Sequence, residues 1–322
     1  MNNKSLKSTA SSRLSAASYN PNRLALIHTG AAVALSVIVT LINYLLNTQI
    51  ESTTGLSGIG TRTVLLSMQS VLTIAGAAAM PFWNVGYLRS SLLVSRERPA
   101  TPTSLLEGFR RFGLVLRMNI LRAVCCGILA FFCLQAATTI FMLTPLSGDF
   151  MDSAMALLET NTVIDDAIMD SLMPSLWSVY ALWLVLAGIV LIPLFYRYRM
   201  ADWAVMDETY SARKAFKESK KLMFRRRTQL LTIDLHFWWY YGLQVLALAV
   251  AYGDILLPAL GVALDPHLAF FGFYLVSQLA QLAIAWRFAP LVNTTYAVTY
   301  DQFKELADKQ FTMVNGELKI EN

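Results

Sequence analysis

The sequence contains six long segments that are apolar nearly all round and have no polar stripe. A helix needs about 20 apolar residues to cross a hydrocarbon core of about 30 Å, and every segment reaches that length. Inside a bilayer the backbone groups must be satisfied within the segment itself, so such segments fold as helices. We therefore expect an all-α polytopic membrane protein with six transmembrane helices, at residues 24–46, 64–87, 123–146, 175–196, 230–252 and 267–288.

The composition excludes a soluble fold. Hydrophobic residues make up 56% of the chain and charged residues only 15%, whereas a soluble domain carries about 25% charged residues. The three cysteines, Cys125, Cys126 and Cys133, fall within one apolar segment. No CxxC pair accompanies them, so we expect small hydrophobic side chains and neither a metal site nor a disulfide framework.

The basic residues are distributed very unevenly between the two sides of the six segments. Of the 26 Lys and Arg residues, only Arg62 falls in or beside a connection on the opposite side from all the others. Short loops rich in Lys and Arg remain in the cytosol, so both termini are expected there. Residues 1–22 are rich in Ser and Asn and predict a disordered cytosolic tail. The membrane domain is expected at 23–303 and a cytosolic C-terminal tail at 304–322.

The second, fourth and sixth segments end alike, which indicates a repeated unit. Each has a proline, Pro81, Pro193 or Pro290, followed by polar-capable residues three and six positions later. Three helical hairpins in the same orientation explain this pattern most simply. A proline frees a carbonyl one turn earlier, and in a membrane that carbonyl needs another partner. The three ends therefore predict either a small polar vestibule that faces the cytosol or ordinary helix ends.

Two cytosolic connections have the pattern of amphipathic helices that lie in the membrane interface. In the first, Leu105, Leu106, Phe109 and Phe112 recur at helical spacing. In the second, within 212–223, small and apolar residues alternate with a basic face, and we expect the apolar face to dip toward the acyl chains. Basic residues beside an anionic leaflet contribute about 1 kcal/mol each. The candidate contacts to anionic lipid are Arg213, Lys214, Lys217, Lys220, Lys221, Arg225, Arg226 and Arg227. The cytosolic excess of basic residues already explains this run, so no nucleic acid is expected as a partner.

Several ionisable and amide side chains fall near the cytosolic ends of the segments, where a polar group is by default a functional hypothesis. Asp234 is expected to pair with Arg287 or Arg122, in a cluster that binds a polar headgroup or relays a proton. The alternative is a structural ion pair with arginines that reach up to the interface. The candidate inner polar cluster consists of Asn84, Asn119, Arg122, Asp234, His236, Arg287 and Asn293.

The stretch from Ala215 to Met223, and the stretch from Leu231 to Tyr241 after it, resemble a bacterial integral membrane family, the domain of unknown function 975. Members of that family carry an Ala-x-x-x-Ser-x-x-x-Met-x-Gly helix, then Leu-x-Leu-Ser-Phe-x-x-Trp, and a proline with Phe or Tyr near the last span. The matching positions are Ser219, Met223, Leu235, Phe237, Trp239 or Trp238, Pro290 and Tyr296. The chain departs at Phe224 and Arg225, where glycine is common, and at His236, where serine is common. The resemblance implies a six-span fold in a bacterial plasma membrane, with no established activity, cofactor or substrate.

We expect a non-catalytic integral membrane protein that interacts with lipids or acts as a scaffold. Its partners are then anionic lipids on the cytosolic face and a membrane or cytosolic protein. One alternative is a permease or transporter component that uses the vestibule, and a weaker one is a membrane enzyme acting on lipid headgroups at Asp234 and His236. The sequence has no HExxH, GxSxG or P-loop motif, so no catalytic residue, cofactor or metal ion is expected.

Overall fold

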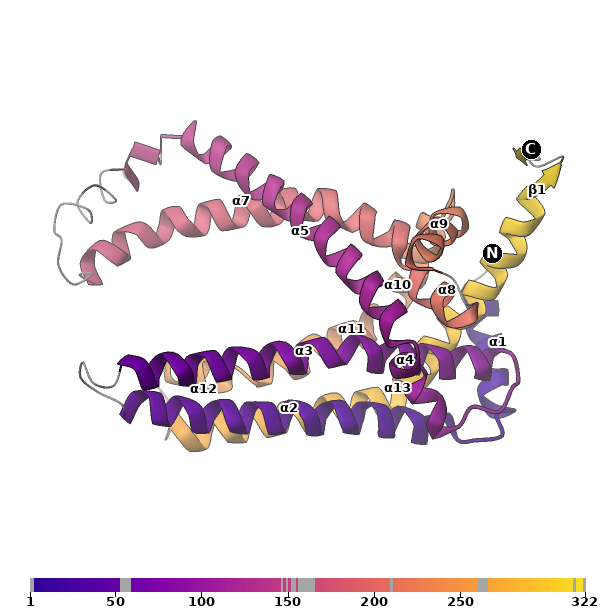
Figure 1. Ribbon diagram of the computed structural model, residues 1–322, viewed down its shortest axis with the longest axis horizontal. Helices are drawn as coiled ribbons and strands as arrows, with labels where there is room; N and C mark the ends of the chain where they lie inside the picture. Colours follow the sequence, from indigo (N-terminus) through magenta and orange to yellow (C-terminus); the bar gives the residue numbers. More distant parts are fainter. Residues whose placement is uncertain are drawn as a thin grey trace. The chain divides into compact units, whose positions relative to one another are not determined.

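The structure is a computed structural model, and its chain divides into two compact units (Figure 1). It describes residues 3–52, 59–145, 166–208, 211–259, 266–314 and 317–320, together with a few positions between 147 and 155. Unit 1 comprises Met1–Leu116 and Met200–Asn322, and unit 2 comprises Arg117–Arg199. Each unit is described by itself below.

Unit 1 is almost entirely helical. Its long helices are α2, Pro21–Ser52, α3, Ile59–Ser95, and α13, Pro266–Gln310. The shorter helices are α1 (Asn3–Ser15), the 3-10 helix η2 (Pro102–Leu106), α4 (Glu107–Arg110), α8 (Ala201–Asp207), α9 (Ala212–Leu222), α10 (Arg227–His236), α11 (Trp238–Val250) and α12 (Gly253–Ala259). The antiparallel strands β1 (Phe311–Val314) and β2 (Glu317–Ile320) follow α13. The C-terminal tail expected from residue 304 therefore begins inside α13.

Five helical segments of the described chain are long and apolar enough to cross a membrane, which makes a multi-pass membrane protein plausible. They are Pro21–Ile50, Gly60–Ser95, Phe112–Met142, Leu172–Asp207 and Ala269–Lys309. They contain three of the six predicted segments, 24–46, 64–87 and 175–196, and they overlap most of two others, 123–146 and 267–288.

The remaining predicted segment, the fifth in the sequence at residues 230–252, is not one continuous helix. It is divided at Phe237 into α10 and α11. The Phe237 backbone N–H donates to the carbonyls of Asp234, at 3.0 Å, and Ile233, at 3.2 Å, which is the tight turn typical of a helix end. The Phe237 ring is only 1% exposed and packs against Tyr296, so a tertiary contact fixes the break.

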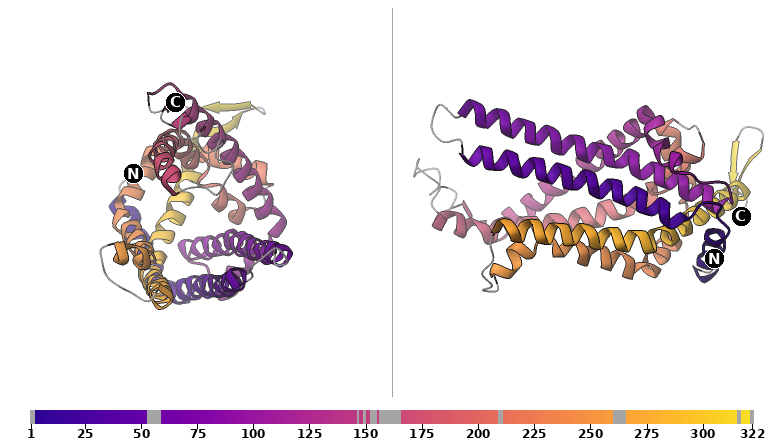
Figure 2. Two further views of the ribbon diagram at one scale, coloured as in Figure 1. Left: turned by 90° about the vertical axis from the view of Figure 1, so that its left-hand side faces the viewer. Right: turned by 90° about the horizontal axis from the view of Figure 1, so that it is seen from below.

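Helices α2 and α3 form an antiparallel hairpin (Figure 2). Side-chain amides join them along their length: Asn43 Nδ2 donates to Thr73 Oγ1 at 3.1 Å, and Gln69 Nε2 donates to Asn47 Oδ1 at 3.1 Å. Hydrogen bonds between polar side chains are a usual way to hold membrane helices together.

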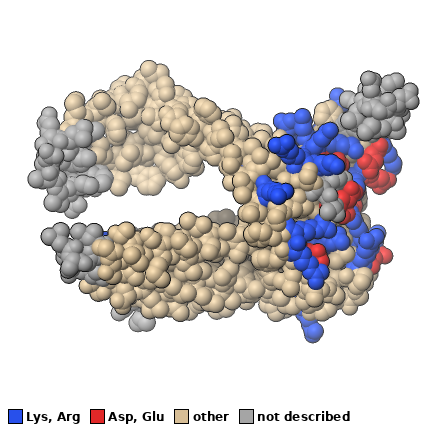
Figure 3. All heavy atoms as spheres, viewed as in Figure 1, with Lys and Arg blue, Asp and Glu red and all other residues tan. Residues whose placement is uncertain are grey.

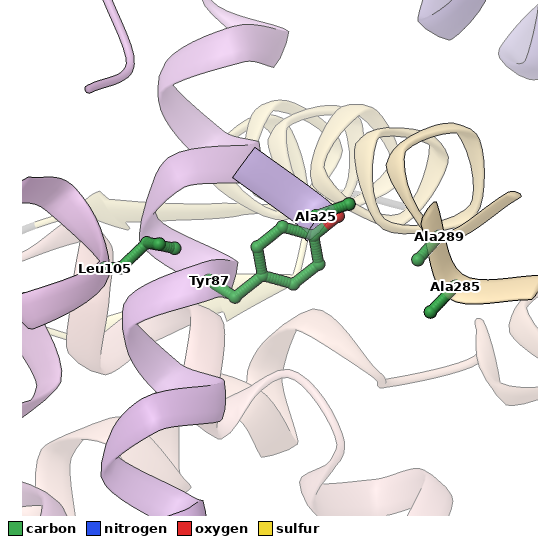
Figure 4. Packing of buried hydrophobic residues seen from close by; sticks show 5 residues of the cluster. All are labelled: Ala25, Tyr87, Leu105, Ala285 and Ala289. Carbon is green, nitrogen blue, oxygen red and sulfur yellow. The ribbon is translucent and has the colours of Figure 1, made fainter. Parts of the chain in front are cut away.

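Helix α13 lies antiparallel to α2. Near the start of α2, Ala25 packs with Ala285 and Ala289, two residues in the middle of α13 (Figure 4). Toward the end of α2, Tyr44 stacks with Phe270, near the start of α13. Small residues at the first contact allow the two backbones to approach closely. The start of α2 therefore lies at the end of unit 1 toward which α13 runs.

Helix α11 also lies antiparallel to α13. At its start, the Trp239 ring meets the Phe288 ring edge-on at 4.8 Å. Just after its end, Gly253 lies against the Phe273 ring. The stretch from Trp239 to Gly253 therefore runs beside the whole stretch from Phe288 back to Phe273.

Two glycines allow the connection after α3 to pack directly on that helix. A Cβ atom on Gly86 would lie 1.8 Å from the Leu105 carbonyl oxygen, and one on Gly108 would lie 1.9 Å from the Phe82 carbonyl oxygen. Because both obstructing atoms belong to the backbone, no side-chain rotation relieves the clash. Leu105 is buried in the cluster that contains Tyr87 (Figure 4), so its expected place on an interfacial face is wrong. Leu106, Phe109 and Phe112, predicted on the same face, are exposed.

The expected disorder of residues 1–22 is wrong for the described part of this segment. Residues Asn3–Ser15 form α1, which packs on α13 and α3. Leu6 and Ala10, one helical turn apart, are buried in this contact, and Arg13 pairs with Glu97 at 2.6 Å. The polar composition suggested disorder, but Leu6 and Ala10 form an apolar face that the helix buries against the rest of the unit.

The expected membrane insertion of the apolar face of 212–223 is also wrong. This segment forms α9, in which the Ser211 hydroxyl caps the helix by accepting from the Lys214 N–H at 3.3 Å. Ala215, Leu222 and Met223 are fully buried, because α9 packs on α8 and α13. The apolar face is therefore part of the protein core, and only the basic face remains exposed.

Unit 2 contains most of α5 (Phe112–Met142) and α7 (Asp166–Tyr198). The Trp183 indole N–H donates to the Ala130 carbonyl at 3.0 Å and so connects the two helices. The three cysteines are free thiols on α5, of which Cys133 is buried, Cys126 is half-buried and Cys125 is exposed.

Candidate functional site

The predicted inner polar cluster is distributed over several places. Asn119 and Arg122 lie on α5 in unit 2, whereas the other five residues lie in unit 1. In unit 1 the cluster separates into three groups: one around Asn84, one around Asp234, and one around Arg287.

Asn84 belongs to an aromatic group between α2 and α3. The His28 imidazole stacks on the Tyr87 ring with centroids 4.5 Å apart, and the Trp83 indole N–H donates to the His28 carbonyl at 2.8 Å. Asn84 is a hydrogen-bond partner of the His28 side chain. This group fastens the start of α2 to α3.

Asp234 lies in the last turn of α10, next to the break at Phe237. The Tyr296 hydroxyl, from α13, donates to the Asp234 carboxylate, and the Tyr241 and Tyr296 hydroxyl oxygens are 2.8 Å apart. The expected pair of Asp234 with Arg287 is not formed between these two described residues, since Tyr296 takes the position of the donor. Sequence reasoning missed the two tyrosines because they lie 55 residues apart and in different segments.

The remaining members of the predicted cluster make local contacts. Arg287 lies over the Phe288 ring, 5.9 Å from its centroid, and faces a cleft beside α1. Asn293 donates to the Ala289 carbonyl of its own helix at 3.0 Å. The His236 ring lies edge-on to the Phe237 ring.

The largest group of charges in unit 1 was not predicted at all. It joins the end of α3, the end of α8 and the last third of α13, and we call it the ion network. Its members are Ser95, Arg96, Asp207, Glu208, Tyr300, Asp301 and Lys304. Figure 3 shows acidic side chains among many basic ones at this end of the unit.

Asp207 is the centre of the ion network, with a side chain that is only 6% exposed. It accepts from Arg96, from Lys304 at 2.9 Å and from the Tyr300 hydroxyl at 3.3 Å. A buried carboxylate loses its hydration, so it needs this number of donors to remain ionised.

Arg96 bridges two helices through its planar guanidinium. One edge donates to Asp207 on α8, while Nε donates to both carboxylate oxygens of Asp301 on α13, at 3.1 and 3.2 Å. These hydrogen bonds raise the pKa of the Arg96 guanidinium above its ordinary value. A forked donor of this kind suits arginine and could not be reproduced by lysine.

Two further arginines hold the end of α8 by its backbone. Arg89 donates to the Met206 carbonyl at 3.0 Å, and Arg111 donates to the Val205 carbonyl at 2.6 Å. Cationic groups stabilise the partial negative charge at a helix C-terminus. The α8 turn is therefore held by side chains from α3 and from the residue just before α5.

One sequence signal could have revealed the ion network. Lys304 follows Pro290 by 14 positions, Asp207 follows Pro193 by 14, and Arg96 follows Pro81 by 15. Asp207 and Lys304 therefore occupy equivalent positions after their prolines, whereas the equivalent position after Pro81 is Ser95, the residue before Arg96. Extending the comparison past the sixth position after each proline would have drawn attention to these places.

Of the eight predicted lipid contacts, two side chains bind other groups of the protein and six are exposed to the surroundings. Arg226 is only 4% exposed, donates to the Leu222 carbonyl at 3.1 Å and lies over the Phe303 ring, so its assignment as a lipid contact is wrong. Lys221 pairs with Asp308 at 3.1 Å. The other six are exposed, and we call them the basic surface: Arg213, Lys214, Lys217, Lys220, Arg225 and Arg227.

No protein-family model, curated protein or solved structure matches the chain. Within the described residues, no group of three or more His, Cys, Asp or Glu side chains could hold a metal ion.

Proposed function

We propose that the chain is a non-catalytic plasma-membrane protein that crosses the bilayer six times and binds anionic lipids through the basic surface. The resemblance to the domain of unknown function 975 supports the bacterial setting. The single observation that carries the proposal is that the cations of the basic surface are exposed and have no acidic partner among the described residues. Six cations are exposed around α9 and the α9–α10 turn, and none of them pairs with a described acid, whereas the neighbouring Lys221 and Arg226 are engaged by the protein.

The α10–α11 pair provides the sixth crossing. The first long helix, α2, and the last, α13, are antiparallel. The chain therefore enters and leaves the bilayer on the same side, in agreement with the contact between α1 and α13. This arrangement needs an even number of crossings. The stretch from Trp239 to Gly253 covers the same depth as α13 from Phe288 to Phe273. The break at Phe237 lies near the cytosolic end of this stretch. Helices α10 and α11 therefore cross the bilayer together, as one of the two helical segments of a hairpin.

The orientation follows from the charges of unit 1. Arg96, Lys304 and the basic surface lie at the end of the unit at which α3 and α13 finish, and Figure 3 shows most Lys and Arg side chains at one end. Arg62 lies near the start of α3, at the other end. A basic end remains in the cytosol. This end therefore meets the anionic leaflet, where each exposed cation adds about 1 kcal/mol of attraction.

The proposal is tested by measuring the lipid shell of the reconstituted protein. The full chain is placed in phosphatidylcholine bilayers with a minority of fluorescent phosphatidylglycerol, and energy transfer from tryptophan reports enrichment near the protein. The triple variant Lys214→Gln, Lys217→Gln and Lys220→Gln is expected to lose about 3 kcal/mol of attraction at low salt. Its enrichment then falls toward the level found at 1 M salt, where the screening length is only about 3 Å.

Two controls separate lipid binding from general effects. Arginine at the same three positions keeps the charge and retains the enrichment. Arg62→Gln removes a charge at the other end of α3 and leaves the enrichment unchanged. Equal enrichment in the glutamine variant and the parent protein contradicts the proposal.

A second candidate function, a permease component, is favoured by one observation. The helix break at Phe237 lies next to Asp234, Tyr241 and Tyr296, three polar side chains joined by hydrogen bonds. Discontinuous helices with polar groups at the break are typical of transporter binding sites. Proteoliposomes loaded with a pH-sensitive dye test this candidate: a proton flux that Asp234→Asn abolishes supports it, and no flux above that of empty liposomes rejects it.

A further inference from the structure

A cleft of about 660 Å³ lies between α1, the start of α2, α11 and the middle of α13. All of these elements belong to unit 1. The volume falls within the range of roughly 300–1,000 Å³ that small-molecule sites occupy. The basic surface on α9 contributes none of the residues that line it, so the cleft is a separate feature.

One wall of the cleft is the face of α1 that points away from the core. Lys7 and Ser11 are one turn apart and line the cleft, whereas Leu6 and Ala10, beside them in the sequence, are buried against the protein. The buried pair fixes the rotation of α1 about its axis. Lys7 and Ser11 are therefore held toward the cleft by the packing of their neighbours.

The opposite wall supplies a second cation and an apolar surface. Arg287 and Phe288 come from α13, and Trp239 comes from α11. The two aromatic rings meet edge-on at 4.8 Å, and the Arg287 guanidinium lies over the Phe288 ring. The cleft thus has a cation and a hydroxyl group on the α1 wall, and a second cation with two aromatic rings on the other wall.

Lys7 and Arg287 have no acidic counterpart in the cleft. The lining residues include no Asp or Glu, and within the described part of the chain neither cation forms an ion pair. Two cations that face one cleft without a carboxylate favour an anionic ligand.

The depth of the cleft in the membrane favours a lipid as that ligand. The stretch of α13 from Ala269 to Arg287 is roughly 27 Å long at 1.5 Å per residue, close to the hydrocarbon thickness of about 30 Å. Arg287 therefore lies where the acyl chains end and the headgroups begin, on the basic side. Tryptophan at this level, here Trp239, is typical of the membrane interface.

We propose that the cleft is a specific site for one anionic phospholipid. The phosphate lies between Lys7 and Arg287 and accepts from the Ser11 hydroxyl, and the start of the acyl chains lies on Trp239 and Phe288. This lipid site rests on the proposed function in one respect, the orientation of the protein in the membrane. Both the cleft and the basic surface need this end of unit 1 to meet the anionic leaflet.

Native mass spectrometry of the full chain in detergent tests the site by counting retained lipids. With added phosphatidylglycerol, we expect one molecule to stay bound at activation energies that remove phosphatidylcholine. The double variant Lys7→Ala and Arg287→Ala is expected to retain it about 30-fold less tightly, which corresponds to about 2 kcal/mol. Equal retention of the two lipids by the parent protein, or unchanged retention by the double variant, overturns the proposal.

Two further variants separate a loss of lipid binding in the cleft from misfolding and from lipid binding at the basic surface. Lys7→Arg with Arg287→Lys conserves both charges and is expected to restore binding, which excludes misfolding as the cause of a loss. Lys217→Ala with Lys220→Ala removes two charges from the basic surface and is expected to leave the tightly bound lipid in place. If instead only this second pair abolishes retention, the cleft proposal fails while the proposed function stands. Displacement of the lipid by glycerol phosphate would show a site for a soluble phosphate and would also overturn the proposal.

Discussion

Removing the Arg96 guanidinium should destabilise the protein more than removing any exposed cation. In the Arg96→Met variant, the buried Asp207 carboxylate keeps only Lys304 and Tyr300 as donors, and Asp301 loses both hydrogen bonds to Nε. Breaking a buried pair by removing one partner typically costs 3–5 kcal/mol, because a charge is left without compensation. The Arg96 side chain is partly exposed, which places the expected loss at the lower end, about 3 kcal/mol.

The measurement is a double-mutant cycle with Asp207→Asn, followed by denaturant unfolding in detergent micelles. Tryptophan fluorescence reports the transition, because Trp203 stacks with Tyr300 beside the ion network. We expect a coupling free energy between Arg96 and Asp207 of about 1–3 kcal/mol. Asp207→Asn should itself be less harmful than Arg96→Met, since an amide is neutral and can still accept from Lys304.

The matched control is Arg110, whose pair with Glu107 lies at the surface. The Arg110 side chain is 66% exposed, and such pairs contribute at most about 1 kcal/mol. Arg110→Met should therefore leave the unfolding midpoint nearly unchanged. If Arg96→Met costs no more than Arg110→Met, or if the cycle gives no coupling, the ion network does not hold α3, α8 and α13 together.

Three other substitutions test separate parts of the structure. Gly86→Ala places a Cβ atom 1.8 Å from a backbone carbonyl oxygen and should cost about 3 kcal/mol or more, whereas Gly30→Ala, with open space around it, should not destabilise the protein in the same unfolding assay. Arg225 has a φ of 58°, a conformation that favours glycine, so Arg225→Gly should raise the unfolding free energy by about 1 kcal/mol. Tyr296→Phe removes the donor to Asp234 and should cost about 1–3 kcal/mol, with hydrogen exchange increasing first in α10; unchanged exchange there would count against this contact.

The backbone of Arg225 lies in the left-handed region, and its guanidinium lies over the Phe224 ring. The strain is tolerated at the end of α9 because Met223 and Arg226 on either side are buried and hold the turn. Arginine at this position adds a cation to the basic surface, which glycine would not.

Local sequence patterns predicted the helices well and their contacts poorly. The five long helices that could cross a membrane followed from apolar length alone, and the amphipathic pattern of α9 predicted a helix with one basic face. The same pattern could not say whether the apolar face meets lipid or protein, because Ala215 and Leu222 suit both environments. Likewise, the charge of Asp234 was recognised as unusual, but its partner Tyr296 could not be identified from sequence spacing.

The sequence by itself determined which segments form helices long and apolar enough to cross a membrane, and which segment ends carry the basic residues. Transfer of apolar residues into lipid is a sum over local segments, so it needs no knowledge of which segments meet. The tertiary structure alone decided the docking of α1, the break at Phe237 and the ion network. Arg96 and Asp301 are separated by 205 positions, and only the packing of α3 against α13 brings the guanidinium to the carboxylate. The free energy of such a contact depends on the burial of both partners, which no local pattern encodes.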